Sequence, residues 1–184
     1  MPVRSSLRST PRRKAISSLP EPPKNSSPEK YVSARKDLVK HIPVLAVARG
    51  NPLGISGVRD LGRSGIRVVL GDAKATPIGK IADKAIADAG LTGKVNVVSR
   101  GVTAPSIFNA LKVGECDAII VWKENVSPDM DIVADPAMDA YVKTIPAAAL
   151  SVSENPEGQK LLLDFLNSDD AHSIWEKHGY VVLN

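Results

Sequence analysis

The groups best placed to do chemistry in this chain are backbone amides at junctions where a predicted strand gives way to a helix. In the first junction, residues 71–80, Thr76 can cap a helix and Pro77 suits its first turn. The N–H groups of Ile78 and Gly79 would then have no acceptor inside the helix. Unpartnered N–H groups and the helix dipole attract anions, so Ile78 and Gly79 are candidate anion-binding residues. The alternative is an ordinary capped junction without a ligand.

Two further positions could supply hydrogen-bond donors in the same way. At the second junction Thr103 can cap a helix and Pro105 suits its first turn, which would leave the amide of Ala104 as a donor. Trp122 closes a predicted apolar strand, and its indole N–H could face a ligand. The commoner role of a tryptophan in this position is packing.

Enzymatic chemistry is not indicated. His41, His172 and His178 are scattered, and none has metal-ligand spacing to another histidine or cysteine. No nucleophile elbow, P-loop or dinucleotide-binding glycine motif is present. Asp169 and Asp170 fit the first turn of a helix better than an acid–base pair. We therefore expect no enzyme, no cofactor and no metal.

Two other candidates have simple structural explanations. Asp129, Asp131 and Asp135 recur in one loop, where a hard-cation site is conceivable, but the glycine and glutamate of a calcium loop are missing. A solvated acidic loop is the alternative. Cys116 is the only cysteine, which excludes an internal disulfide, and its place before an apolar strand predicts a buried thiol.

The charge of the chain is divided unevenly. Of the 24 Lys and Arg residues and the 20 Asp and Glu residues, ten basic and three acidic ones fall in residues 1–40, although the whole chain carries only +4. The first 34 residues also hold six of the 14 prolines and no periodic apolar face. We predict a disordered basic tail over residues 1–36 and a folded domain over residues 37–184. Such a tail could contact nucleic acid or an anionic membrane, but a solvated segment explains it, and no nucleic-acid partner is expected.

No apolar run is long enough to span a membrane. The N-terminus shows no secretory signal, so the expected location is cytoplasmic if the sequence is complete.

The folded part alternates between two kinds of periodicity. A buried strand is predicted over residues 42–48, further strands over 66–70, 95–98 and 118–122, and a fifth apolar stretch over 146–152. Helical stripes are predicted over 56–62, 78–89 and 106–111, and two amphipathic helices precede a short final strand. This alternation predicts an α/β fold with a doubly wound, mostly parallel sheet. In such sheets ligands bind beyond the carboxyl ends of the strands.

Several motifs resemble the molybdate/tungstate ABC transporter substrate-binding protein family. They are G-N-P at residues 50–52, G-D-A-K-A-T-P-I-G-K at 71–80, G-E-C-D-A-I-I-V-W at 114–122, and the closing helices of residues 155–184. Their order and spacing extend the resemblance over residues 37–184.

The resemblance implies a type II periplasmic-binding-protein-like lobe that carries a tetrahedral oxyanion, molybdate or tungstate, to an ABC transporter permease outside the cytoplasmic membrane. It further implies that amides of Ile78 and Ala104 hold the anion. The family's tyrosine position is matched by Trp122, whose indole N–H donates but cannot accept.

The resemblance also exposes a difference, because the first lobe and its two ligating serines have no counterpart here. Hydrogen bonds to a charged group contribute about 1.5–3 kcal/mol each, whereas micromolar binding requires about 8.2 kcal/mol. We therefore predict millimolar or weaker oxyanion binding by this chain alone. The alternative function is a ligand-sensing regulatory or interaction module of the same fold.

Overall fold

The computed structural model of the protein describes residues 28–183. Residues 1–27 of the predicted tail lie outside the described residues. The first strand, β1, spans Val32–His41, so the boundary predicted between residues 36 and 37 falls inside it. A short 3-10 helix, Pro28–Tyr31, precedes this strand.

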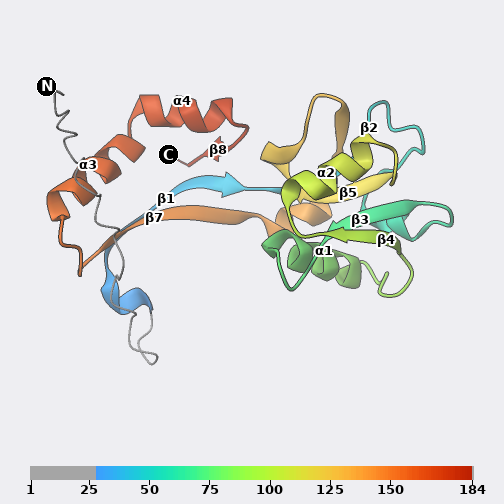
Figure 1. The fold of residues 1–184 in the computed structure, drawn as a ribbon, viewed down its shortest axis with the longest axis horizontal. Helices are drawn as coiled ribbons and strands as arrows, with labels where there is room; N and C mark the ends of the chain where they lie inside the picture. The colour runs from blue at the N-terminus through green and yellow to red at the C-terminus, as the bar shows by residue number, and fades with distance from the viewer. Residues whose placement is uncertain (1–27, 184) are drawn as a thin grey trace, which may run out of the picture.

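A five-stranded sheet forms the centre of the larger part of the molecule (Figure 1). Its order is β4 (Asn96–Gly101), β3 (Arg67–Gly71), β5 (Ala118–Trp122), β2 (Pro43–Ala48) and β6 (Met130–Val133). β3 runs parallel to β4 and β5, whereas β2 is antiparallel to β5 and β6. Every strand except β2 therefore points the same way, which confirms the predicted α/β class and mostly parallel sheet.

Two helices cover opposite faces of this sheet (Figure 1). α1 (Pro77–Asp88) connects β3 to β4, and α2 (Ala104–Lys112) connects β4 back to β5. Because the two crossovers run in opposite directions along the sheet, right-handed connections place their helices on opposite sides. Shorter 3-10 helices occupy Val58–Gly62, Lys123–Asn125 and Pro136–Tyr141. No helix among residues 28–183 is long and apolar enough to span a bilayer.

The hydrophobic core lies between the sheet and these helices, and every residue of its buried cluster falls between Val44 and Tyr141. Leu45, Leu70 and Ile119 are completely buried in it. α1 contributes the apolar stripe that its sequence predicts, including Ile81. We call residues 43–142 the α/β domain.

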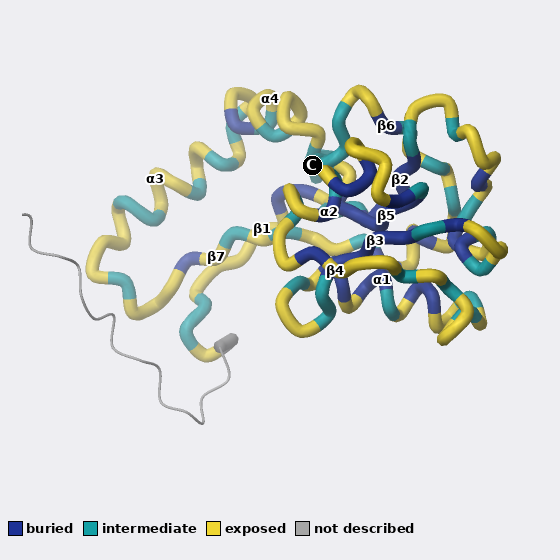
Figure 2. Tube along the Cα trace, turned by 45° about the vertical axis from the view of Figure 1, so that its right-hand side comes forward, coloured by how far each residue is buried: buried dark blue, intermediate teal, exposed yellow. Residues whose placement is uncertain are grey.

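The remaining residues form an arm that leaves the α/β domain (Figure 1). Its base is a ribbon in which β1 pairs antiparallel with β7 (Lys143–Leu150), and β8 (Val181–Val182) adds two pairs to β1. α3 (Pro156–Leu166) and α4 (Asp169–Lys177) lie beyond β7. Figure 2 shows that the arm is mostly exposed or half-buried, while the deeply buried trace belongs to the α/β domain.

Candidate anion-binding site

The carboxyl ends of β3, β4 and β5 meet at one edge of the five-stranded sheet, because these three strands are parallel neighbours. The amide of Asp72 donates to Gly101 O at 2.8 Å and ties the first two strand ends together. α1 begins after β3 and α2 after β4, so both helix starts lie beside this edge. Trp122 closes β5 at the same edge. The fold thus brings three of the predicted donor positions, Ile78, Ala104 and Trp122, to one edge of the sheet.

The two amides predicted as donors at the start of α1 differ in whether they already have an acceptor. Thr76 is the N-cap, and the Gly79 N–H donates to Thr76 Oγ1 at 3.1 Å. The Ile78 N–H has no acceptor among residues 28–183. Ile78 therefore keeps a free donor, whereas the Gly79 N–H is already engaged.

Gly79 has a second, steric role. A Cβ added at Gly79 would lie 2.5 Å from Gly71 O and 2.6 Å from the carbonyl carbon of Asp72. The absence of a side chain lets the first turn of α1 pack directly on the end of β3.

The start of α2 is built in the same way but with a reciprocal cap. The Ser106 N–H donates to Thr103 Oγ1 at 3.3 Å, and the Thr103 N–H donates to Ser106 Oγ at 3.3 Å. Pro105 carries no N–H. The Ala104 N–H has no acceptor within the part of the chain that the structure describes, so it is the free donor of this helix start.

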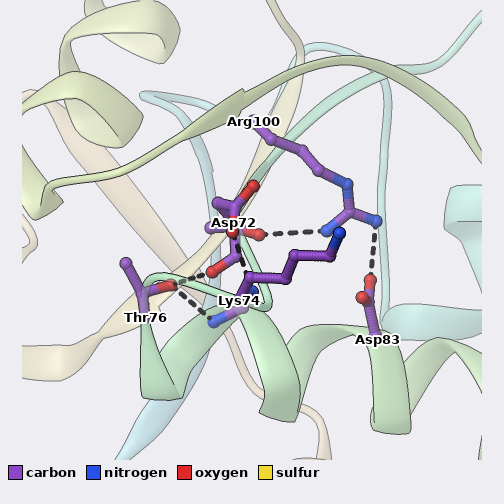
Figure 3. A network of polar contacts seen from close by, with 7 residues as sticks. Asp72, Lys74, Thr76, Asp83 and Arg100 are labelled. Atoms are coloured by element: carbon purple, nitrogen blue, oxygen red, sulfur yellow. Dashed lines mark hydrogen bonds and ion pairs between the residues drawn. The ribbon is translucent and has the colours of Figure 1, made fainter.

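A network of polar contacts holds the loop before α1 in place (Figure 3). Asp72 Oδ1 accepts the amides of Lys74 and Ala75 at 2.7 and 2.9 Å, and these two bonds lower the pKa of the Asp72 carboxyl. Arg100 donates to Gly71 O at 3.0 Å and to Asp83 Oδ1 at 2.7 Å. The network fixes the start of α1. It also supplies the Asp72 carboxylate with hydrogen-bond donors from the same loop.

Trp122 is packed and still accessible at one edge. It is 9% exposed, and its ring stacks on His41 with centroids 3.5 Å apart. His41 Nε2 lies 2.7 Å from Glu124 Oε1, so this carboxylate also has a partner. The indole N–H has no acceptor among residues 28–183, yet no unpartnered side-chain nitrogen there is fully buried. Among the described residues the indole N–H is thus available as a donor.

Trp122 also lines a groove of about 450 Å³ beside the start of α1, which neither Ile78 nor Ala104 lines. The groove is lined by His41, Pro77, Lys80, Ile81, Lys84, Trp122, Ala140, Tyr141 and Lys143. Three of these residues are lysines. Two carboxylates bond lining residues within the described part of the chain: Asp88 accepts from the Tyr141 hydroxyl and from Lys84, and Glu124 lies against His41. Three lysines against two carboxylates leave a small excess of positive charge, which favours an anion.

Tyr141 is held as a neutral phenol. Its hydroxyl donates to Asp88 Oδ2 at 2.5 Å, and this bond is the main cause that raises the pKa of Tyr141 to about 12.

Several other sequence candidates have structural roles. Cys116 is buried, as predicted, and burial raises its pKa to about 11. Asp131 accepts the Gly50 amide at 2.7 Å, and Asp135 accepts the Val58 amide at 2.7 Å. No group of three His, Cys, Asp or Glu residues among the described residues could hold a metal ion. Asp169 and Asp170 lie in the first turn of α4, as predicted.

Sequence reasoning missed His41, Lys80 and Lys143 as residues around the groove. The available signal was weak. His41 and Lys143 are cross-strand partners at the end of the ribbon next to the α/β domain, and only strand pairing brings them together.

Comparison with known proteins identifies the family to which this chain belongs. The sequence profile described as bacterial extracellular solute-binding protein matches residues 15–181. A provisionally named binding protein of Haemophilus influenzae is 26% identical over 151 residues, which are 78% of this chain and 60% of that protein. A provisionally named ABC transporter substrate-binding lipoprotein of Bacillus subtilis is 24% identical over 154 residues, which are 80% of this chain and 59% of that protein. The chain thus spans about three fifths of the length of these curated relatives.

Solved structures show the same fold. The substrate-binding domain assigned to a molybdenum ABC transporter of Clostridium difficile has a TM-score of 0.68 and 24% identity, covering 85% of this chain and 70% of that chain. The periplasmic molybdate-binding protein of Azotobacter vinelandii has a TM-score of 0.59 and 14% identity, covering 85% of this chain and 72% of that chain. These likenesses confirm the periplasmic-binding-protein-like fold. Since the family profile covers most of the sequence, the protein belongs to the bacterial extracellular solute-binding protein family.

Proposed function

We propose that this protein captures a tetrahedral oxyanion, molybdate or tungstate, outside the cytoplasmic membrane and presents it to the permease of an ABC importer. The proposal rests on three N–H donors at one edge of the sheet that have no acceptor among residues 28–183. They are the amides of Ile78 and Ala104 and the indole of Trp122. The likeness to the Clostridium difficile domain of a molybdenum ABC transporter and to the Azotobacter vinelandii molybdate-binding protein supports the choice of anion.

The donor set favours a fully ionised anion. Molybdate and tungstate carry no proton near neutral pH and need only donors, whereas hydrogen phosphate must also place an O–H on an acceptor. Asp72 Oδ1 accepts two backbone amides, and Glu124 Oε1 lies 2.7 Å from His41 Nε2, so one oxygen of each carboxylate is engaged.

The affinity expected of this chain is low. Three hydrogen bonds to a charged group contribute about 4.5–9 kcal/mol in total before the costs of association are subtracted. A net binding energy of about 4.1 kcal/mol corresponds to a millimolar dissociation constant. We therefore expect tungstate to bind in the millimolar range or more weakly.

The family and relatives are substrate-binding proteins and do not favour the alternative of a regulatory module. The proposal includes no enzyme activity and no cofactor. The family description supports a location outside the cytoplasmic membrane, as does the relative in Bacillus subtilis, which is named as a lipoprotein.

Calorimetric titration with tungstate, with sulfate and phosphate as controls, tests the proposal. Ala104→Pro removes one donor at the first position of α2, where proline fits the helix geometry. This variant should weaken tungstate binding about tenfold or more, since a hydrogen bond to a charged group is lost. Asp169→Pro introduces proline at the first position of α4, away from the groove, and should leave binding unchanged. Equal tungstate affinities in both variants would sink the proposal.

The indole contact has its own matched pair. Trp122→Phe removes the N–H while keeping a ring to stack on His41. Trp175→Phe removes the N–H of the other tryptophan, whose ring packs edge-on against Tyr180 in the arm. Only the first substitution should lower the heat of tungstate binding.

A further inference from the structure

The groove beside the start of α1 offers more apolar surface and more charge than a small inorganic anion can use. Its volume of about 450 Å³ lies within the range of about 300–1,000 Å³ that is typical of small-molecule sites. Neither of the amides assigned to the oxyanion lines this groove, and Trp122 alone belongs to both places. The groove is therefore a candidate site for a second ligand, at the point where the α/β domain meets the arm.

The apolar surface of the groove comes from side chains that are otherwise buried. Ile81 of α1, Trp122 of β5 and Tyr141 of the third 3-10 helix after β1 are all buried, and all three line the groove. A ligand seated there would contact aromatic and aliphatic carbon. Because covering apolar surface is favourable, this part of the groove favours a ligand with a hydrocarbon body.

Two of the three lysines that line the groove keep an uncompensated charge. Lys84 Nζ lies 2.8 Å from Asp88 Oδ2 and 5.8 Å from the centre of the Tyr141 ring, so the charge of Lys84 is compensated beside the groove. Lys80 of α1 and Lys143 of β7 form no ion pair with any residue that the structure describes. Two positive charges from two different elements are thus left for a ligand.

The carboxylates near the groove do not cancel these two charges. Glu124 Oε1 lies 2.7 Å from His41 Nε2, and neither Glu124 nor Asp88 lines the groove. A ligand with two negative groups would meet positive charge at short range, where the attraction exceeds that in bulk water. A ligand that also carries an ammonium group, such as an amino acid, would bring a third positive charge to the same place and be disfavoured.

The lining side chains offer few hydrogen-bond acceptors. Lysines only donate, and the side chains of Pro77, Ile81 and Ala140 have no polar atom. The Tyr141 hydroxyl donates its proton to Asp88. A ligand rich in hydroxyl groups, such as a sugar, would leave donors unpaired at a cost. The chemistry of the groove therefore fits an anion with carboxylate groups and an otherwise apolar body.

We propose that the groove binds a small organic dicarboxylate. Its two carboxylates pair with Lys80 and Lys143, and its carbon chain lies against Ile81, Trp122 and Tyr141. Lysine suits this role, because its ammonium is a point charge on a flexible stem and can follow a carboxylate. An inorganic oxyanion has no carbon with which to cover the apolar surface, so this ligand belongs to a different class from the proposed oxyanion.

Calorimetric titration of the full chain with linear dicarboxylates from succinate to pimelate tests the proposal. Tungstate is left out, and the ionic strength is kept low because salt screens exposed charges. The best dicarboxylate should bind at least tenfold more tightly than the linear monocarboxylate with the same number of carbons. Glutamate, which adds an ammonium group to glutarate, should bind at least tenfold more weakly than glutarate. Sulfate, a dianion without carbon, should bind more weakly than the best dicarboxylate.

Substitutions of the lysines locate the contacts. Lys80→Gln and Lys143→Gln each remove one charge and keep a long polar side chain. Each should weaken binding of the dicarboxylate about tenfold or more, since a hydrogen bond to a charged group is lost. Lys94→Gln is the matched control, because Lys94 is an exposed lysine in the loop after α1 and does not line the groove. This control should leave the affinity unchanged.

A fourth variant tests the volume of the groove without changing its charge. Ala140 is exposed and lines the groove, so Ala140→Leu adds carbon to the groove at a position where the fold has room. The variant should weaken binding of the dicarboxylate about tenfold or more and leave the melting temperature unchanged.

Three results would overturn the proposal. One is that no dicarboxylate binds more tightly than the matched monocarboxylate. Another is an affinity for sulfate equal to that for the best dicarboxylate, which would mean that the groove attracts any dianion. The third is an equal loss of affinity in Lys94→Gln and in the two lysine variants of the groove. None of these results depends on whether tungstate binds, because tungstate is absent from the titrations.

Discussion

The α/β domain and the arm contain similar kinds of side chain but use them differently. In the α/β domain, apolar residues at strand and helix spacing meet one another and form the whole of the buried core cluster. In the arm, apolar residues at helical spacing on α3 remain exposed. The difference shows that apolar periodicity predicts an amphipathic element but does not reveal whether its partner lies in the same chain.

The largest expected difference between the two regions is in stability. Leu45→Ala removes a completely buried side chain from the α/β domain and should lower the free energy of unfolding by about 2–5 kcal/mol. Leu162→Ala on α3 should change it by no more than about 0.5 kcal/mol, because the side chain is already exposed. Urea denaturation measures both. Similar losses would mean that the arm is packed in solution.

A smaller contrast comes from two glycines at the third position of helices. Gly79→Ala forces a Cβ against the backbone of Gly71 and Asp72 and should destabilise the protein by about 1–3 kcal/mol. Gly158→Ala in α3 meets only the Asn155 side chain, which can rotate away. Loss of that cap, worth about 1 kcal/mol, should be offset by the helix propensity of alanine, which gains about as much. Thermal unfolding of the two variants should therefore differ clearly, and equal melting temperatures would show that the α1 start can relax.

The smallest expected effect on stability comes from the Tyr141–Asp88 bond in the α/β domain, and it appears only in alkaline solution. In the folded protein the pKa of Tyr141 is raised to about 12, mainly because its hydroxyl donates to Asp88. The unfolded chain releases this proton near pH 10, so it binds fewer protons than the folded state between about pH 10 and 12. The stability supplied by this bond is present below that window and is lost as pH rises through it.

Tyr141→Phe should remove the loss of stability that the Tyr141–Asp88 bond causes between about pH 10 and 12. The measurement is the free energy of unfolding as a function of pH. The lysines titrate in both proteins, so their effect cancels in the comparison. Identical alkaline profiles would contradict the role of the Tyr141–Asp88 bond.

The sequence predicted the α/β domain well because its signals are local. The apolar run at 118–122 and the stripe over 78–89 correspond to β5 and α1, and the caps at Thr76 and Thr103 form as expected. The strand β6 was not predicted, because it is short and carries Asp131 in what reads as an acidic loop.

Features that depend on distant pairing could not be predicted in this way. β1 reads as polar chain over Ser33–Asp37, and its strand conformation comes from pairing with β7, more than a hundred residues later. The direction of β2, antiparallel to both neighbours, likewise leaves no mark in the apolar run at 43–48. For the site, the helix starts predicted which amides are candidates. Only the structure shows that the cap engages Gly79 and that Ile78 remains free.

We propose an oxyanion site on the α/β domain made of three N–H donors, and a tungstate titration followed by nitrogen–proton NMR of the full chain tests this site at the level of single donors. We expect the amide signals of Ile78 and Ala104 and the indole signal of Trp122 to shift together along one millimolar binding curve, while the signals of Leu161 and Phe165 on α3 stay in place. Unchanged signals at those three donors, with or without shifts elsewhere, would contradict it.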